Sequence, residues 1–252
     1  MCSRDMDQKG FLCSALVSLR WNMALKAVIF DLGLTLIRTA SFPEIYRRIL
    51  ARFGVTASLA DIVRAQKETE NEFDTSTYDE NHRKEFWTNY NVSLLKKMGV
   101  EENTVFLAEQ IDALWWDCSH VQVYPDVEPT LFGLRAKGLK LGLVSNGFKQ
   151  DLDHVLGELG LEKWFDAVVC IDSCNCAKPD KRIFLYALDK LGIEPHEAVF
   201  VGDSASQDYE GALGVGIKPY LIDREGKLPS QYNKIGSLTE LLTLVYDPTT
   251  II

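Results

Sequence analysis

The chain has 252 residues, of which 46% are hydrophobic and 25% are charged, and its formal net charge of -9 gives a pI near 5.0. This length allows one large domain or a core with a smaller second domain, and the composition is typical of globular proteins. An acidic chain without a basic stripe is not expected to bind nucleic acid. No apolar run reaches the roughly 18 residues that a membrane span needs, so no membrane partner is expected either.

Residues 1–23 are predicted to form a loose N-terminal extension. The apolar stretch at 11–19 has the length of a signal-peptide core, but Asp5 and Asp7 dilute the basic end, and no clean cleavage site follows. A compact domain that begins with a strand would start near Met23. We therefore expect a cytoplasmic protein and leave these residues out of the fold prediction.

The apolar run at residues 27–30 is predicted to be the first buried strand, and it ends at Asp31. A carboxylate at the end of a buried strand costs free energy unless it has a partner or a use. Asp31 is therefore the first candidate functional residue in the chain.

The next block, residues 39–123, shows no comparable strand pattern and is predicted to be all-helical. Apolar residues at helical spacing indicate helices over 41–54, 58–74, 81–99 and 101–117. The candidate N-caps are Ser41, Ser58 and Asn81, and the candidate stops are Gly54 and Gly99. Its tryptophan and tyrosine residues (Trp87, Tyr90, Trp115 and Trp116) fall at helical spacing and are expected to pack in its core.

Short apolar runs alternate with amphipathic stretches through the rest of the chain. After a turn and a helix over 124–138, the pattern indicates strands at 139–146, 165–171, 197–203 and 217–223, and helices at 148–160, 179–192, 206–216 and 237–245. Such alternation is typical of a parallel sheet covered by helices on both faces. We predict an α/β core formed by 24–38 and 124–252, with the all-helical block inserted at 39–123.

Polar side chains follow the predicted strands at their carboxyl ends, where open parallel sheets bind ligands. In chain order these residues are Asp31, Ser145 with Asn146, Lys178, and Asp203 with Asp208 about one helical turn later. A single aspartate at a strand end is usually a helix N-cap, and a single Lys-Pro is usually a surface turn. Four strand ends that carry such residues in the right order are hard to explain as coincidence.

The residue types at these strand ends favour phosphoryl transfer. Clustered carboxylates raise one another's pKa values unless a cation lies among them, and Mg²⁺ prefers carboxylate, carbonyl and water oxygens. A serine hydroxyl and a lysine ammonium would bind an anion held by that metal, and a phosphoryl group matches all of these partners. An aspartate that faces the phosphoryl group can act as nucleophile and form an aspartyl phosphate.

The sequence resembles the haloacid dehalogenase superfamily of hydrolases, in particular its phosphatases with a helical cap. The matching segments are DLGLT (31–35), LVSNG (143–147), AKPD (177–180) and GDSASQD (202–208), which occur in the order of the family. The resemblance implies a Rossmann-like core, a cap at 39–123, and a small phosphorylated metabolite as substrate.

The same resemblance implies a role for each matching residue. Asp31 would be the nucleophile and Lys178 the second catalytic residue. Phosphate would be bound by Ser145, Asn146, Lys178 and Thr35. Mg²⁺ would be held by Asp31, Asp203, Asp208 and the backbone carbonyl of Gly33.

Gly33 departs from the family pattern. Family phosphatases usually carry an aspartate at this position, which protonates the leaving group and then activates water, and a glycine is common where this chain has Leu34. Loss of a general acid–base costs about 10²–10⁴ in rate. We favour a phosphatase that is slow, that uses substrates with good leaving groups, or that borrows a proton carrier such as His82 or Glu85.

Three alternatives remain open. A phosphonate hydrolase would form a Schiff base on a lysine of the helical block, for which Lys67, Lys84, Lys96 and Lys97 are available. A dehalogenase would use Asp31 to attack carbon without a metal. A binding or regulatory module would keep the ligands and lack turnover.

The six cysteines are irregularly spaced in a long chain, so a disulfide framework is not expected and a reducing compartment is favoured. Cys170, Cys174 and Cys176 cluster just before Lys178, where a buried strand and its following loop are predicted. A soft-metal site or a redox pair are the alternatives there. The chain is expected to act as a monomer or a homodimer.

Overall fold

The computed structural model describes residues 25–73 and 83–245, so the predicted N-terminal extension, His82 and the proposed N-cap Asn81 lie outside the described residues. The chain divides into two compact units. The sheet unit contains the described residues up to Leu36, Tyr124–Lys149, and the described residues from Gly160 onward. The helical unit contains Ile37–Val123 and Gln150–Leu159.

The sheet unit is built on a parallel sheet of six strands in the order β5-β4-β1-β6-β7-β8, which confirms the predicted fold class. The strands are β1 (Ala27–Phe30), β4 (Lys140–Val144), β5 (Ala167–Val169), β6 (Ala198–Gly202), β7 (Lys218–Ile222) and β8 (Lys234–Ile235). Strand β1 lies between β4 and β6, with Ala27 opposite Lys140 on one side and Ala198 on the other. Its four residues are all buried, as expected for a strand that is covered on both faces.

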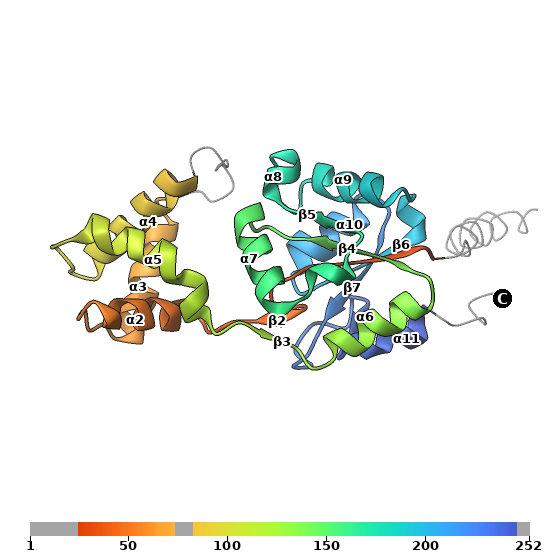
Figure 1. Cartoon of the computed structure of the whole chain (residues 1–252), viewed down its shortest axis with the longest axis horizontal. Coiled ribbons are helices and arrows are strands. Elements are labelled where there is room, and N and C mark those ends of the chain that lie inside the picture. The colour runs from red at the N-terminus through yellow and green to blue at the C-terminus, as the bar shows by residue number, and fades with distance from the viewer. Residues whose placement is uncertain (1–24, 74–82, 246–252) are drawn as a thin grey trace, which may run out of the picture. The chain divides into compact units, whose positions relative to one another are not determined.

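Helices cover both faces of this sheet (Figure 1), with α6 (Val127–Ala136) and α11 (Leu241–Leu244) on one side and α8 (Ile171–Cys174) and α9 (Lys181–Leu191) on the other. Helix α9 buries Phe184 against Phe200 of β6, with ring centroids 5.3 Å apart. It begins where the Asp180 side chain accepts a hydrogen bond from the Arg182 backbone N–H, and it ends at Gly192, whose φ is 63°.

The helical unit contains α2 (Phe42–Arg52), α3 (Leu59–Glu70), α4 (Arg83–Lys97) and α5 (Thr104–Ser119), together with most of α7 (Lys149–Leu159). Ser58 caps α3, as predicted, by accepting a hydrogen bond from the Asp61 backbone N–H. Tyr90 is buried, and Trp87 and Trp115 pack against the same core, which confirms the expected place of these three aromatic residues.

The structure differs from the predicted elements at several places. The strand predicted at 165–171 is shorter in the structure, where only β5 (Ala167–Val169) is extended. It ends there because Cys170 leaves the sheet, and the Cys170 backbone N–H donates to the Ser173 hydroxyl at the start of α8. The predicted helix at 206–216 begins as a π-helical turn (Ala205–Tyr209) and continues as α10 (Glu210–Leu213). The short strands β2 (Ile37–Arg38) and β3 (Gln122–Val123) form an antiparallel ribbon, and these two strands and β8 were not predicted.

Among the described helices, none combines the length and the apolar composition that crossing a bilayer requires.

Candidate active site

The residues singled out at the strand ends all belong to the sheet unit. Asp31 directly follows β1, Ser145 and Asn146 directly follow β4, and Asp203 directly follows β6. Lys178 lies in the loop between α8 and α9, and Asp208 lies on the π-helical turn that follows β6. Because β4 and β6 flank β1, the three strand ends meet at the same edge of the sheet.

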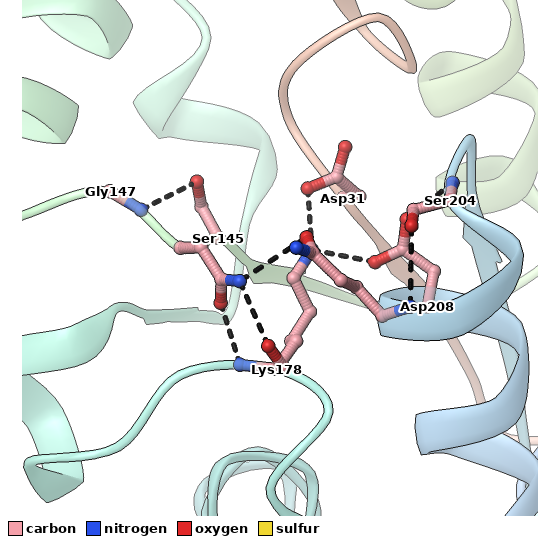
Figure 2. Close-up of polar contacts among 8 residues, drawn as sticks. Asp31, Ser145, Gly147, Lys178, Ser204 and Asp208 are labelled. Carbon is pink, nitrogen blue, oxygen red and sulfur yellow. Dashed lines mark hydrogen bonds and ion pairs between the residues drawn. The ribbon is translucent and has the colours of Figure 1, made fainter. Parts of the chain in front are cut away.

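The ammonium group of Lys178 joins two of the carboxylates. Its Nζ lies 2.6 Å from Asp31 Oδ1 and 2.7 Å from Asp208 Oδ1, and Figure 2 shows Lys178 between the two aspartates. The side chain of Lys178 is nearly inaccessible to solvent, with 4% of the residue exposed. Both ion pairs are therefore shielded from water, which makes each of them stronger than a surface pair.

Burial changes the titration of this cluster. For Asp31 it is the largest influence, and it raises the pKa even though the Lys178 charge acts in the opposite direction. Burial, followed by the charges of Asp31 and Asp208, raises the pKa of Asp203 to about 6. Burial alone would lower the pKa of Lys178, but the two neighbouring carboxylates raise it. The cluster thus holds more negative charge than one ammonium balances.

The three aspartates fit a hard divalent cation. Asp31, Asp203 and Asp208 each offer a carboxylate oxygen, and these oxygens lie within 4.8 Å of one another. Carboxylate oxygens are the ligands that Mg²⁺ prefers, and a second positive charge would offset the repulsion that raises the pKa of Asp203. Within the described ranges, no other group of histidine, cysteine or acidic residues is placed to hold a metal.

The predicted phosphate-binding residues have different surroundings. The Ser145 hydroxyl accepts a hydrogen bond from the Gly147 backbone N–H at 3.2 Å, which leaves its own O–H free to donate (Figure 2). The Asn146 amide is engaged with the Lys178 backbone. The hydroxyl of Thr35 is buried without a hydrogen-bond partner in the described part of the chain, while the Thr35 carbonyl accepts a bond from Arg224 at 2.9 Å.

Gly33 and Leu34 form the turn after Asp31. Gly33 is exposed, and a Cβ atom placed on it would meet nothing within 4 Å. Leu34 has a φ of 56° and is 55% exposed, so a leucine occupies a left-handed conformation that glycine adopts more easily. The turn therefore keeps the backbone geometry of a glycine position without the glycine.

Two further residues of the matching segment 202–208, to which the sequence assigned no role, fix the place of the Asp208 side chain. The Ser204 backbone N–H donates to Asp208 Oδ2 at 2.9 Å. A Cβ on Gly202 would overlap the Asp208 carboxylate, so only glycine fits at this position. The GDS triplet at 202–204 is the sequence signal for both contacts, but their partner becomes visible only in the fold.

Cys174 and Cys176 are joined by a disulfide, with their Cα atoms 5.4 Å apart, and the other described cysteines, Cys118 and Cys170, are buried free thiols. The bridge links positions two residues apart, so it is local and adds no connection between distant elements. No metal-binding group of the described residues includes any of these cysteines.

Comparison with known proteins identifies the family. A family model described as haloacid dehalogenase-like hydrolase matches residues 25–216. The chain belongs to the haloacid dehalogenase-like hydrolases. This membership confirms the predicted family and the predicted enzyme class, a hydrolase with relatives that are named phosphatases.

Relatives of this hydrolase include phosphatases and dehalogenases. A glyceraldehyde 3-phosphate phosphatase from Methanopyrus kandleri is 33% identical over 206 residues, which cover 81% of this chain and 85% of the relative. The crystal structure of a phosphatase of the family from Thermococcus onnurineus is 30% identical, with a TM-score of 0.61 over 88% of this chain and 98% of that one. A 2-haloacid dehalogenase from Pseudomonas syringae is 26% identical, with a TM-score of 0.64 over 88% of this chain and 97% of that one.

Proposed function

We propose that this hydrolase is a Mg²⁺-dependent phosphatase of small phosphorylated metabolites that acts through an aspartyl phosphate on Asp31. The observation that carries the proposal is the placement of the Lys178 ammonium 2.6 Å from Asp31 and 2.7 Å from Asp208, in one cluster with Asp203. A buried cluster of this kind is costly for a protein that only needs to fold, because its carboxylates repel one another. Binding of a phosphoryl group and a divalent cation would use every member.

In the proposed mechanism, Asp31 attacks the phosphorus atom of the substrate. Lys178 holds Oδ1 of Asp31, so we assign the attack to Oδ2, which is turned away from Lys178 in Figure 2. The new bond joins Oδ2 to phosphorus, and the ester oxygen leaves with the electron pair of the bond that breaks. We assign to the Lys178 ammonium and the Ser145 O–H the stabilisation of the charge that develops on the phosphoryl oxygens.

Hydrolysis of the aspartyl phosphate then releases inorganic phosphate and restores Asp31. The first step needs a proton for an alkoxide leaving group, the second needs a group that takes a proton from the attacking water, and Gly33 can supply neither. Esters whose leaving group is already a weak base avoid this need in the first step. The proposed enzyme is therefore expected to prefer such substrates over alkyl phosphates. A proton carrier from the helical unit, such as Glu85, stays a prediction.

We propose that Mg²⁺ is held by Asp31, Asp203 and the carbonyl of Gly33, with support from Asp208. When bound, it would neutralise charge on the substrate phosphoryl group. The name of the Methanopyrus kandleri relative supports a phosphorylated metabolite as substrate. We further propose that residues 39–123 act as the cap that selects this metabolite and that 24–38 and 124–252 form the catalytic core, in a cytoplasmic monomer or homodimer.

The proposal is tested by phosphate release from p-nitrophenyl phosphate, with Mg²⁺ and with EDTA. Release is expected only with Mg²⁺, and Asp31→Asn is expected to abolish it. Asp189→Asn, which changes an exposed aspartate of α9, is the matched control and should keep wild-type turnover. Absence of release from every phosphate ester at saturating Mg²⁺ would refute the proposed function.

A dehalogenase is the second candidate, because a halide leaving group needs no proton and Gly33 would then not slow the first step. The similarity to the Pseudomonas syringae dehalogenase supports this alternative. It would predict halide release from 2-haloacids in the presence of EDTA. Phosphonoaldehyde cleavage that borohydride inactivates would indicate a phosphonate hydrolase instead, and phosphate binding without turnover would indicate a binding module.

A further inference from the structure

The loop that carries Lys178 lies outside regular secondary structure, between α8 and α9. The ammonium at the end of this long side chain nevertheless makes two short contacts, at 2.6 Å and 2.7 Å. A lysine side chain has many rotamers, so it can hold both contacts only if its backbone is fixed. Some contact must therefore set the position of the backbone at residue 178.

That contact is the side chain of Asn146. Its Oδ1 accepts a hydrogen bond from the Lys178 backbone N–H at 2.7 Å, and its Nδ2 donates to the Lys178 carbonyl at 3.1 Å. A backbone N–H can only donate and a carbonyl can only accept, so this pair also fixes the orientation of the amide. Asn146 thus binds both backbone polar groups of Lys178, much as a neighbouring strand would.

The hydrogen-bonding capacity of Asn146 limits what else it can do. An asparagine amide has two N–H donors. One donates to the Lys178 carbonyl, and Nδ2 also donates to Gln207 Oε1 at 3.3 Å. With both donors engaged, only lone pairs of Oδ1 remain, and these repel an anion. The side chain of Asn146 therefore has no donor left for a phosphate oxygen.

From this geometry we infer that the side chain of Asn146 is a positioning group that holds Lys178, and that this side chain does not itself bind phosphate. The inference rests on the proposed function only for the catalytic role of Lys178. The adjacent residues after β4 then have separate tasks. Ser145 directs its hydroxyl to the substrate, and Asn146 fixes the loop that brings the ammonium to Asp31 and Asp208. Misplacement of a catalytic group by about 1 Å can cost about 10²-fold in rate.

The inference is tested by lysine acetylation with acetic anhydride, followed residue by residue with mass spectrometry. Wild-type Lys178 is buried between carboxylates and should react slowly. Asn146→Ala should raise the Lys178 rate by about tenfold or more, the factor that corresponds to about 1.4 kcal/mol. Lys234, which pairs with Asp223 at 2.8 Å elsewhere in the sheet unit, is the internal reference and should react at an unchanged rate.

Two variants complete the test. Asn146→Asp has the same size as the wild-type side chain and keeps the acceptor for the Lys178 N–H, but its second oxygen faces the Lys178 carbonyl. This variant should therefore also raise the Lys178 acetylation rate. It provides the test if the alanine variant does not fold. Gln207→Ala removes only the outer contact and should leave the Lys178 rate unchanged. An unchanged rate in both Asn146 variants, or an equal rise in Gln207→Ala, would overturn the inference.

Turnover provides a readout that a merely structural role would not move. With p-nitrophenyl phosphate, Asn146→Ala should lower kcat by about 10²-fold while KM stays within about threefold. If the Asn146 side chain bound phosphate directly, KM would rise instead, as it should in Ser145→Ala, and the inference would fail. If the wild type has no turnover, the proposed function fails, and the acetylation rates still decide whether Asn146 positions Lys178.

Discussion

Lys178 and Asp31 are 147 positions apart in the sequence, yet the Nζ of Lys178 lies 2.6 Å from Asp31 Oδ1 in the interior of the sheet unit. The ammonium compensates two buried carboxylates at once, because Asp208 lies 2.7 Å away on its other side. Loss of the lysine is therefore expected to affect folding as well as the proposed catalysis.

Lys178→Met is expected to lower the free energy of unfolding at pH 7 by about 3 kcal/mol in metal-free protein, since it leaves two carboxylates buried without a counter-charge. The same variant should have no measurable phosphatase activity. Urea unfolding measures the first effect. Lys234→Met is the control: the Lys234 side chain is 31% exposed, so the cost should be about 1 kcal/mol or less. Equal losses in the two variants would contradict the assigned role of the buried pair.

Asp203 should make the stability of the metal-free protein depend on pH. Its pKa is raised from 3.8 to about 6 in the folded protein, so the folded state holds this proton more tightly than the unfolded state does. Stability contributed by the protonated form is lost as pH rises through this range. The free energy of unfolding of Asp203→Asn, relative to wild type, should therefore increase between about pH 4 and pH 6 and stay level above about pH 7.

Paired urea titrations across this pH range measure the difference. A difference that is independent of pH would show that Asp203 is not destabilised by its surroundings. Mg²⁺ supplies a check on the cause, because it should raise the melting temperature of wild type more at pH 7 than at pH 5.

Gly33→Asp should give the enzyme the proton carrier that it lacks. The position is exposed, and a Cβ atom there would have no neighbour within 4 Å, so the new side chain fits without displacing others. We expect turnover of alkyl phosphates to rise by about 10²-fold, with a much smaller gain on p-nitrophenyl phosphate. Gly33→Asn, which has the same shape and cannot carry the proton, is the control. No gain on alkyl phosphates would mean that another group already transfers the proton.

Leu34→Gly should stabilise the protein. Leu34 has a φ of 56°, where a side chain costs about 1–2 kcal/mol, and its exposed side chain has little packing to lose. The greater freedom of glycine in the unfolded chain offsets part of this gain, which leaves about 0.5–1 kcal/mol. Leu185→Gly, at a 49% exposed position within α9, should instead destabilise by about 1 kcal/mol. Chemical denaturation measures the free energy of unfolding of both variants. A change of the same sign in both would contradict the assigned effect of the Leu34 backbone conformation.

The sequence was sufficient to predict five of the six strands of the sheet and the order of the site residues. Buried parallel strands are short apolar runs, and a polar residue directly after such a run marks its carboxyl end, as Asp31 and Asp203 do. Elements of two residues, such as β2 and β8, carry no usable periodicity. The π-helical turn around Asp208 was also missed, because its apolar pattern is too short to separate it from an α-helix.

Contacts between distant segments account for the rest of the site. Nothing near position 146 in the sequence indicates that the asparagine side chain would bind the backbone of Lys178. The need for glycine at position 202 likewise depends on where Asp208 folds back. Leu34 even argues against the left-handed turn that the structure contains. Such features follow from tertiary packing, which local patterns do not encode.

The central place of β1 has a consequence for how the protein is made. Ala27–Phe30 leave the ribosome before either neighbouring strand, since their partners in the sheet are Lys140–Leu143 and Ala198–Val201. During translation this apolar segment therefore has no strand to pair with on either side while Ile37–Val123 of the helical unit are synthesised, and it is open to misassociation for that time. A nascent chain stalled before β6 would be the species that a chaperone must shield.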